Sequence, residues 1–553
     1  MRACLELERL LRQFTKKAGL PWPDKVIIEP PKYKHFGNLT TNLTMVLAKE
    51  TKRNPRELAG QAREFLLAHS YELASVEVAG PGFLNCIFGP AFWHATIPDV
   101  LATGENYGSV DVGRNKRVQV EFVSANPTGP LHIGHGRGAA IGDSLARILR
   151  FTGHKVSCEY YLNDVGHQMW LLGLSVWVRL QQRLGRDVIL PENCYQGDYI
   201  TDIASDLLAT RPELADWPKE RKTEAIDTCR LFATHAILEG INRDLTNFRV
   251  THDVWFSEQS LLDTGAVDKT LEWLMAAGLT FDEGGALWFR TIELGDDKNR
   301  VLRKSDGSLT YFATDIAYHA DKFDRGFEQV VNIWGADHHG YIPRMQAAIT
   351  ALGRPTGSLK IILVQLVNLL TDDKSISMST RTGTFRTLAD VCHEVGTDAA
   401  RFVFLLRKSD SKLDFDLELT KRKSMDNPVY YVQYAHARIC SMQRKARKLG
   451  NNLVLQASVE LDRLDTDEDL ELLRLLERFP ETCATAAELL APHHISHYLL
   501  ELATMLHRYY AVNPVLAAKD RGLTIARLTL MATVARVLKN GLGLLGVTAP
   551  DKM

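Results

Sequence analysis

The sequence predicts an α/β protein: a Rossmann-type parallel sheet with a helical insertion, an N-terminal α+β domain and a C-terminal all-α helix bundle. Apolar residues alternate at 118–122, recur at helical spacing over 141–149 and alternate again at 155–162, which predicts a strand–helix–strand unit. Residues 170–248 favour helices, and strand patterns end near residue 427. A chain of 553 residues is also too long for one hydrophobic core.

The N-terminal domain is predicted to cover residues 1–112. A charged amphipathic helix is expected at Leu5–Lys17, and Gly37–Asn42 leads into a second helix. Residues 76–85 form a strand-like segment that closes the domain. Glycines mixed with asparagines then predict a linker; they are Gly104, Gly108 and Gly113.

The parallel sheet is predicted to lie in a second domain, residues 113–420. Two further strands are expected at Val330–Trp334 and Ile361–Leu366, far along the chain from the first two. The helical stretch at about 170–248 therefore interrupts the sheet as an insertion.

The last predicted domain, residues 421–553, is a helix bundle. Its apolar residues recur three and four positions apart, as on the buried face of a helix. Examples are Leu470, Leu473 and Leu476, and again Ile495, Leu499, Leu502 and Leu506.

Composition limits the partners and the compartment. The net charge is −1, so a polyanion must be met by local basic patches. The eight cysteines occur singly, without the close pairs of zinc sites, so we expect no zinc, no other protein-bound metal and a reducing cytoplasm. The apolar run Ile361–Leu370 is too short to cross a bilayer, and residues 1–20 are charged throughout, so neither a membrane span nor a secretion signal is predicted.

The stretch Ser124–His135 reads SANPTGPLHIGH and is predicted to form a strand-to-helix turn. Helix N-termini favour anions through free amide groups and the helix dipole. Two histidines, two glycines and two prolines suit a backbone that passes close to a nucleotide and offers imidazoles to its phosphates. For His132–His135 alone, the alternative is a chance match whose histidines only cap a turn.

Two further segments carry polar groups toward the same pocket. Asn163–Gln168 follows the second strand, and the carboxyl ends of parallel strands meet at one edge; a plain helix cap is the alternative. Tyr311 and Asp315 are four residues apart and share a face if the segment is helical. A carboxylate beside a phenol can bind a cation and favours a planar guanidinium, although a lone aspartate is more often a surface residue.

Two more segments add charge. Asp337, His338 and His339 follow a predicted strand, but adjacent histidines point in different directions, so a nucleotide or substrate pocket is favoured over a metal site. Lys374–Phe385 is a loop of small residues with Lys and Arg, suited to move over phosphates. A plain surface loop is its alternative.

Together these segments resemble the arginyl-tRNA synthetase family over essentially the whole chain. His132–His135 resembles the HIGH signature of class I aminoacyl-tRNA synthetases, and Asn163–Gln168 and Asp306–Tyr318 are more discriminating. Tyr430–Arg438 resembles the start of the family's anticodon-binding helical domain. The resemblance implies a cytoplasmic, monomeric enzyme that joins L-arginine to ATP, with Mg²⁺ carried by the nucleotide. Arginyl-adenylate and pyrophosphate form, and the arginyl group passes to the terminal ribose of tRNA(Arg).

The resemblance also implies a role for individual residues. The arginine-binding residues would be Asn126, Glu258, Tyr311 and Asp315. The ATP-binding residues would be His132, Gly134, His135, Asp337, His338, His339, Met378 and Ser379, with the two histidines of the HIGH signature also catalytic. The tRNA-binding residues would be Phe83 and Asn85 in the N-terminal domain and Tyr434, Arg438 and Arg444 in the helix bundle.

The sequence departs from the family at the mobile loop, which normally reads Lys-Met-Ser-Lys-Ser. Here Ser377–Arg381 reads SMSTR, so both lysines are missing. Some relatives compensate with a lysine just ahead of the HIGH signature, but this position is Gly129. We expect Lys374 or Arg381 to supply the missing catalytic charge, because a loop can bring either cation to the phosphates.

Two other functions compete with this interpretation. One is a synthetase-like tRNA-binding protein that has lost activation, although the intact HIGH signature and arginine-pocket residues argue against decay. The other is a different class I enzyme, such as a cysteinyl or glutaminyl synthetase. The scattered cysteines argue against the first of these, and a carboxylate-rich pocket argues against the second.

Overall fold

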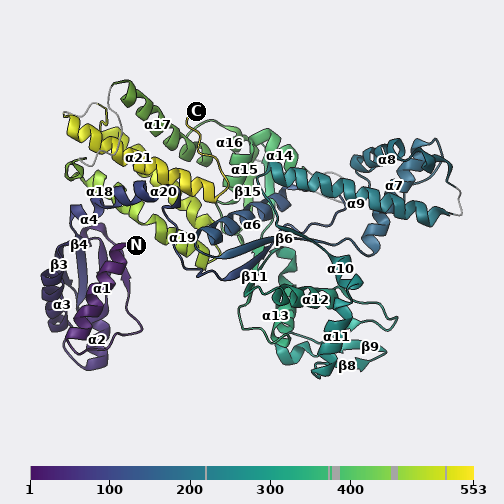
Figure 1. The fold of residues 1–553 in the computed structure, drawn as a ribbon, viewed down its shortest axis with the longest axis horizontal. Helices are drawn as coiled ribbons and strands as arrows, with labels where there is room; N and C mark the ends of the chain where they lie inside the picture. The colour runs from purple at the N-terminus through teal and green to yellow at the C-terminus, as the bar shows by residue number, and fades with distance from the viewer. Residues whose placement is uncertain (1, 218–220, 372–373, 376–385, 450–458, 517–519) are drawn as a thin grey trace.

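The computed structural model describes residues 2–217, 221–371, 374–375, 386–449, 459–516 and 520–553 (Figure 1). The predicted fold class is confirmed: along the chain, an N-terminal α+β domain is followed by a five-stranded parallel sheet with helices and then by a C-terminal helix bundle. In Figure 1 the N-terminal domain lies at the lower left, the bundle at the upper left and the attachments of the sheet at the right.

The N-terminal domain is a four-stranded antiparallel sheet in the order β1-β2-β4-β3, against which three helices pack. Residues 76–85, expected as one strand, form parts of two strands, because the chain turns back at Gly80–Gly82. The predicted amphipathic helix is confirmed, with Leu7, Leu10 and Leu11 fully buried. The elements are α1 (Arg2–Lys17), β1 (Ile28–Glu29), η1 (Lys34–Phe36), β2 (Leu39–Thr41), α2 (Leu43–Thr51), α3 (Pro55–His69), β3 (Leu73–Ala79) and β4 (Phe83–Phe88).

The glycine-rich segment predicted as a linker packs against the C-terminal bundle. The Asn540 side chain donates to the carbonyl oxygens of Gly104 (3.0 Å) and Tyr107 (3.1 Å). The short helices before it also pack on the bundle; they are α4 (Pro90–His94), α5 (Thr96–Thr103) and η2 (Gly104–Asn106). The bounds of the three domains stay a prediction.

The parallel sheet has the order β12-β11-β5-β6-β7. The predicted strand at Lys155–Leu162 has these same bounds. β6 and β7 are added on one side of β5, and β12 is added on the other side, next to β11. The order in which strands are added therefore reverses between β5 and β11. The strands are β5 (Arg117–Glu121), β6 (Lys155–Leu162), β7 (Val254–Ser257), β11 (Gln329–Gly335) and β12 (Leu359–Val364).

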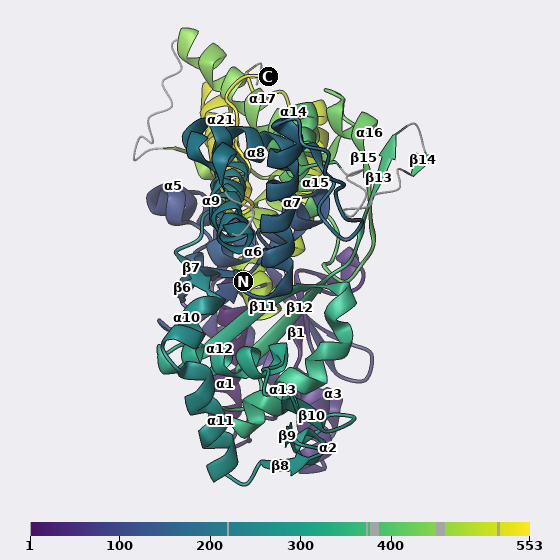
Figure 2. The ribbon, with the colours of Figure 1, turned by 90° about the vertical axis from the view of Figure 1, so that its right-hand side faces the viewer.

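Helices cover both faces of this sheet (Figures 1 and 2). Helix α6 (Ile133–Phe151) packs on one face, and α12 (Tyr311–Asp324) and α13 (Ile342–Ala351) lie on the other. The buried apolar side chains accordingly form two clusters, one on each side of the sheet.

Two attachments interrupt the sheet. The predicted helical insertion lies between β6 and β7 and consists of α7 (His167–Arg183), α8 (Asp198–Thr210), η3 (Pro212–Asp216) and α9 (Lys222–Asn247). The second, between β7 and β11, holds an antiparallel sheet that the sequence did not predict, because four-residue strands are too short to show a period. It consists of α10 (Glu258–Asp263), α11 (Ala266–Ala276), β8 (Thr280–Glu283), β9 (Ala286–Phe289), η5 (Thr291–Leu294) and β10 (Arg300–Arg303).

The strand expected at Ile361–Leu366 ends two residues early, at Val364. The backbone N–H of Gln365 donates to the Ser409 carbonyl at 2.9 Å, and the chain then enters a separate sheet, β14-β13-β15 (Figure 2). The elements here are β13 (Val367–Thr371), β14 (Lys374–Ser375), α14 (Leu388–Val395), α15 (Thr397–Phe404), β15 (Leu413–Asp416) and α16 (Leu417–Lys421).

The C-terminal bundle confirms the predicted helical spacing. Ile495, Leu499, Leu502 and Leu506 are each at most 1% exposed. None of the helices in the described parts of the chain is long and apolar enough to span a membrane. The bundle consists of α17 (Pro428–Lys448), η7 (Leu461–Arg463), α18 (Asp467–Glu477), α19 (Phe479–Glu488), α20 (His493–Val512) and α21 (Arg521–Leu544).

Candidate active site

The predicted site residues gather at the carboxyl edge of the parallel sheet. The turn 122–132 follows β5, and η6 (Ala336–Tyr341) follows β11. These two segments flank the point where the strand order reverses, which is where open α/β sheets bind ligands. Asn163 follows β6 and Glu258 follows β7, so four strands contribute to one edge.

The turn after β5 is strained and firmly held. Val123 and Ser124 have φ angles of 70° and 40°, which residues other than glycine rarely adopt. Tyr160 donates its hydroxyl to the Ala125 carbonyl at 2.8 Å. The Ser124 hydroxyl donates to Glu121 at 3.0 Å and accepts the backbone N–H of Tyr161 at 3.1 Å. These bonds maintain a backbone conformation that would otherwise relax.

The two histidines of the turn begin helix α6. His132 is the N-cap residue, and its Nδ1 accepts the Gly134 N–H at 3.1 Å. His135 Nδ1 accepts the His132 N–H at 3.3 Å, and the two rings stack with centroids 3.6 Å apart. Because both Nδ1 atoms act as acceptors, the proton of each neutral ring lies on Nε2, which is then a donor.

Burial keeps both imidazoles neutral. Burial lowers the pKa of His132, and burial together with the neighbouring His132 lowers the pKa of His135 to about 3. Gly134 allows this close arrangement, since a Cβ atom there would lie 2.9 Å from Cε1 of His132. The turn therefore presents neutral donors and the N-terminus of a helix to the edge of the sheet.

Two carboxyl groups at this edge of the sheet are close enough for their charges to interact. Glu258 is 3% exposed at the start of α10; burial and then the charge of Asp315 raise its pKa to about 7. Burial raises the pKa of Asp315 to about 6, although the Tyr341 hydroxyl donates to its Oδ2. The surroundings of both groups disfavour the charged carboxylate. A cationic ligand would stabilise both carboxylates, so the pair is suited to bind one.

Side-chain amide groups lie at the same edge of the sheet. The Asn126 side chain donates to Gln168 Oε1 at 2.7 Å, which joins the turn to α7. With its amide nitrogen facing the acceptors, Asn163 donates to Glu258 Oε2 at 3.1 Å. Tyr311 lies one helical turn before Asp315 on α12 and is 63% exposed. The structure thus brings Asn126, Glu258, Tyr311 and Asp315 to one edge.

Asp164, which the sequence placed in the same constellation, has a different contact. It accepts the Ser257 hydroxyl at 2.5 Å and the Gln259 backbone N–H at 3.1 Å. Asp164 therefore binds the first turn of α10, the helix that begins with Glu258, whereas the helix that follows Asp164 directly, α7, has no side-chain cap, so the local helix-cap alternative is not what the structure shows.

The sequence did not predict a buried polar network that supports the helix carrying Asp315. Lys322, fully buried on α12, donates to Glu121 at 2.5 Å and to Asn332 at 3.1 Å. The Asn332 amide contacts His319 at 2.8 Å, and His319 in turn contacts the Asp315 carbonyl at 2.7 Å. The network ties β5 and β11 to the helix that carries Asp315. No clear signal in the sequence reveals it, because Lys322 lies between Asp321 and Asp324, as a surface lysine would.

The residues after β11 lie at the open side of the edge. Asp337, His338 and His339 are exposed in η6, and His338 Nε2 is 3.6 Å from Asp337 Oδ2. His338 is near enough to Asp315 for its charge to lower the pKa of that carboxyl group. Tyr341, in the same segment, was assigned no role from the sequence although it donates directly to Asp315.

The predicted mobile loop is described only at its ends. Met378, Ser379 and Arg381 lie outside the described residues, and Lys374 is described as backbone in β14. Beyond the loop, the Leu388 N–H donates to the Leu131 carbonyl at 2.8 Å, directly before His132. One end of the loop is therefore attached to the HIGH turn.

Gly129, where some relatives carry a lysine, is covered by the helical insertion. The Tyr199 hydroxyl of α8 donates to the Thr128 carbonyl at 2.6 Å. A Cβ atom at position 129 would lie 3.1 Å from that hydroxyl oxygen. Any larger residue at this position would require Tyr199 to shift by a few tenths of an ångström, so the contact with the insertion favours a small residue here.

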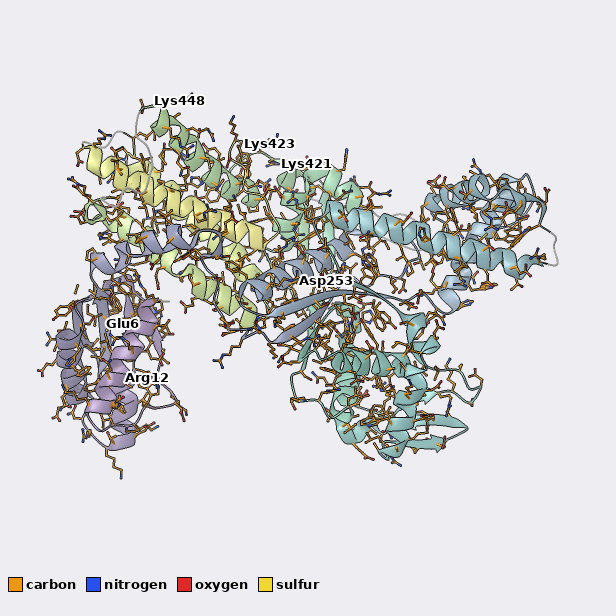
Figure 3. The ribbon with its side chains drawn as sticks, in the orientation of Figure 1. Glu6, Arg12, Asp253, Lys421, Lys423 and Lys448 are labelled. Atoms are coloured by element: carbon orange, nitrogen blue, oxygen red, sulfur yellow. The ribbon has the colours of Figure 1, made fainter. Side chains whose placement is uncertain are left out.

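The predicted tRNA-binding residues occupy two surfaces. Phe83 is 36% exposed, whereas Asn85 is 6% exposed within β4. On the bundle, a cleft of about 590 Å³ is lined by Tyr434, Arg438 and Arg444. The Arg438 guanidinium lies 3.7 Å from the centre of the Tyr510 ring. Figure 3 shows Lys421, Lys423 and Lys448 along the upper edge of the molecule; Lys448 is the last residue of α17, which also carries Arg438 and Arg444.

A Rossmann-type sheet with a HIGH turn at its switch point defines a class I aminoacyl-tRNA synthetase. The model of the class I (R) tRNA synthetase catalytic domain matches residues 96–416. The model of the arginyl tRNA synthetase N-terminal domain matches residues 5–88, and that of the DALR anticodon binding domain matches residues 432–553. The chain belongs to the arginyl-tRNA synthetase family.

Individual relatives agree with this family. The chain is 57% identical to the arginine–tRNA ligase of Oleidesulfovibrio alaskensis and 56% identical to that of Nitratidesulfovibrio vulgaris, with 100% of each chain covered in both comparisons. The arginyl-tRNA synthetase structure of Thermus thermophilus has the same fold, with a TM-score of 0.77, 24% identity and 100% of both chains covered.

Proposed function

We propose that this protein activates L-arginine with ATP and transfers it to tRNA(Arg). The interacting carboxyl groups of Glu258 and Asp315, at the same edge of the sheet as the HIGH turn, carry the proposal, because they match a guanidinium. A neutral or shorter side chain leaves both groups without a counter-charge. Arginine-dependent exchange of pyrophosphate into ATP, measured with and without tRNA, tests the activation step; no exchange in either case would contradict it.

The residues of this chain can support activation as follows. Glu258, Asp315, Asn126 and Tyr311 hold arginine so that its carboxylate faces the α-phosphorus of MgATP, the second substrate. A carboxylate oxygen attacks this phosphorus, and the bond to the bridging oxygen of pyrophosphate breaks. His132 and His135 donate hydrogen bonds from Nε2–H to phosphate oxygens, and this stabilises the charge that builds up in the transition state. A ribose hydroxyl of tRNA then attacks the arginyl carbonyl carbon; an ester bond forms, the bond to the phosphate oxygen breaks, AMP leaves and the proton of the hydroxyl is released.

The paired carboxyl groups predict a pH dependence of arginine binding. The pKa values of Glu258 and Asp315 in the unliganded protein are about 7 and about 6. A bound guanidinium stabilises the charged carboxylates and therefore lowers both pKa values. Binding of arginine at lower pH consequently releases protons. Affinity is expected to stay constant above pH 7 and to fall, by about tenfold per pH unit for each proton, as the pH drops through these values. Calorimetric titration in buffers of different ionisation enthalpy measures both effects, and affinity that does not change with pH contradicts the pairing.

The missing loop lysines predict a second effect. Lys374→Ala or Arg381→Ala is expected to slow pyrophosphate exchange by about tenfold to a hundredfold, because one cation near the phosphates is lost. Lys360→Ala, on β12, is the matched control. Near-normal exchange in both loop variants would show that neither residue replaces the lysine.

The remaining proposals concern the binding of tRNA and ATP, the oligomeric state and the cellular compartment. The cleft of Tyr434, Arg438 and Arg444 combines rings with guanidinium groups, which suits exposed RNA bases and backbone, and Phe83 offers an exposed ring in the N-terminal domain. Asp337, His338, His339, Met378 and Ser379 are proposed to border ATP, whose Mg²⁺ is carried by the phosphates. A monomer in the cytoplasm is proposed from the family resemblance.

A further inference from the structure

A cluster of potential metal ligands lies in the C-terminal domain, separate from the candidate active site. His436 and Cys440 are one helical turn apart on α17, so they lie on the same face. Asp551 comes from the C-terminal tail, 111 residues beyond Cys440. One ligand atom of each residue lies within 4.8 Å of the other two.

The histidine is oriented as metal-binding histidines are. His436 is 4% exposed, and its Nδ1 lies 3.0 Å from the Pro550 carbonyl oxygen, to which it can only donate. The proton is thereby assigned to Nδ1, and Nε2 keeps its lone pair. A backbone carbonyl on one ring nitrogen is the usual device that fixes the other nitrogen as a ligand. The Cys440 sulfur lies 3.8 Å from Nδ1 and 3.9 Å from Nε2, so it is next to the ring but not yet placed on the Nε2 side.

The other two ligands meet at the surface. The half-buried Cys440 thiol donates to Asp551 Oδ1 across 3.5 Å, and Asp551 itself is exposed. If Cys440 loses its proton, the thiolate and the carboxylate lie side by side, and a cation bound between them would offset their repulsion. One nitrogen, one sulfur and one carboxylate oxygen form a ligand set that Zn²⁺ accepts, with water in the fourth position.

We propose that His436, Cys440 and Asp551 bind one divalent transition-metal ion of the zinc type. On binding, the S–H bond of Cys440 breaks, its proton passes to water and a sulfur–metal bond forms. The expectation of no zinc rested on the absence of close cysteine pairs. This cluster uses a single cysteine and a carboxylate from the other end of the domain, so spacing in the sequence does not reveal it.

The ion would fix the wall of the cleft described above. Lys552 and Met553, which follow Asp551, line this cleft together with Arg438 and Tyr510. The Arg444 guanidinium also donates to the Asp551 carbonyl at 3.0 Å. A metal bridge from α17 to Asp551 would therefore hold the tail beside the basic side chains of the cleft.

Titration of the full-length protein with Co²⁺ tests the site. The expected result is one ion per chain and a thiolate-to-cobalt charge-transfer band, which Zn²⁺ removes by competition. Cys440→Ser should abolish the band, and Asp551→Asn should weaken Co²⁺ binding at least about tenfold. Cys4→Ser, a half-buried cysteine of α1, is the matched control and should leave the band unchanged.

Folding controls distinguish the loss of metal binding from the loss of folded structure. Asp551 is exposed in the tail, so Asp551→Asn should keep the circular dichroism spectrum and melting temperature of the unchanged protein. No charge-transfer band in that protein, a band that survives Cys440→Ser, or equal Co²⁺ affinity in Asp551→Asn would each overturn the proposal.

Discussion

Asp315→Asn is expected to lower kcat/KM for arginine activation by about 10²- to 10³-fold, which corresponds to the loss of one partner of a buried charged pair. Asparagine keeps the shape of the side chain and an oxygen that can accept the Tyr341 hydroxyl, but it has no charge for a guanidinium. Pyrophosphate exchange at varied arginine concentration measures the effect.

The same substitution should not destabilise the unliganded protein. Burial raises the pKa of Asp315 to about 6, so the folded state disfavours this carboxylate, and the stability it costs is greatest above pH 6. The melting temperature of Asp315→Asn above this pH is therefore expected to equal or exceed that of the unchanged protein. Asp324→Asn, at the exposed end of the same helix, is the control and should change neither property. A fall in activity that tracks a fall in melting temperature would refute a role in arginine binding.

His132→Asn is expected to lower kcat of pyrophosphate exchange by about 10²- to 10³-fold, with little change in KM for arginine. Asparagine is a good N-cap residue, so α6 should still begin at the same position. Its shorter side chain cannot offer the Nε2 donor to the phosphates, and this loss acts mainly in the transition state.

His235→Asn, on the exposed surface of α9, is the matched control for this histidine. Circular dichroism should show unchanged helix content in both variants. If His132→Asn raised KM for arginine as much as it lowered kcat, the imidazole would be acting on the arginine pocket and not on the phosphates.

Local patterns predicted the frame of the site. The strand Lys155–Leu162 and the helix that starts at the HIGH turn follow from periodicity and from the turn residues between them. Tyr311 and Asp315 lie on the same face of α12, as their spacing of four residues predicts. Each of these features depends on residues that are neighbours along the chain.

Features that depend on distant parts of the chain were missed. Tyr341 reaches Asp315 across 26 residues, and Lys322 reaches Glu121 across 201 residues. The apolar run after Ile361 divides into β12 and β13 because Gln365 bonds to Ser409, a partner that no local pattern names. Asn85 alternates with its neighbours as a surface residue does, yet it is buried within the N-terminal sheet.

Charging of tRNA tests the central claim most directly. Purified protein is incubated with ATP, tRNA and each amino acid in turn, and the aminoacylated 3′ end is quantified. A site built on Glu258 and Asp315 should charge tRNA(Arg) with arginine and should discriminate against glutamine and cysteine by at least about 10³-fold, because neither pairs with buried carboxylates. Charging with another amino acid, or binding of tRNA with no charging at all, would contradict the account.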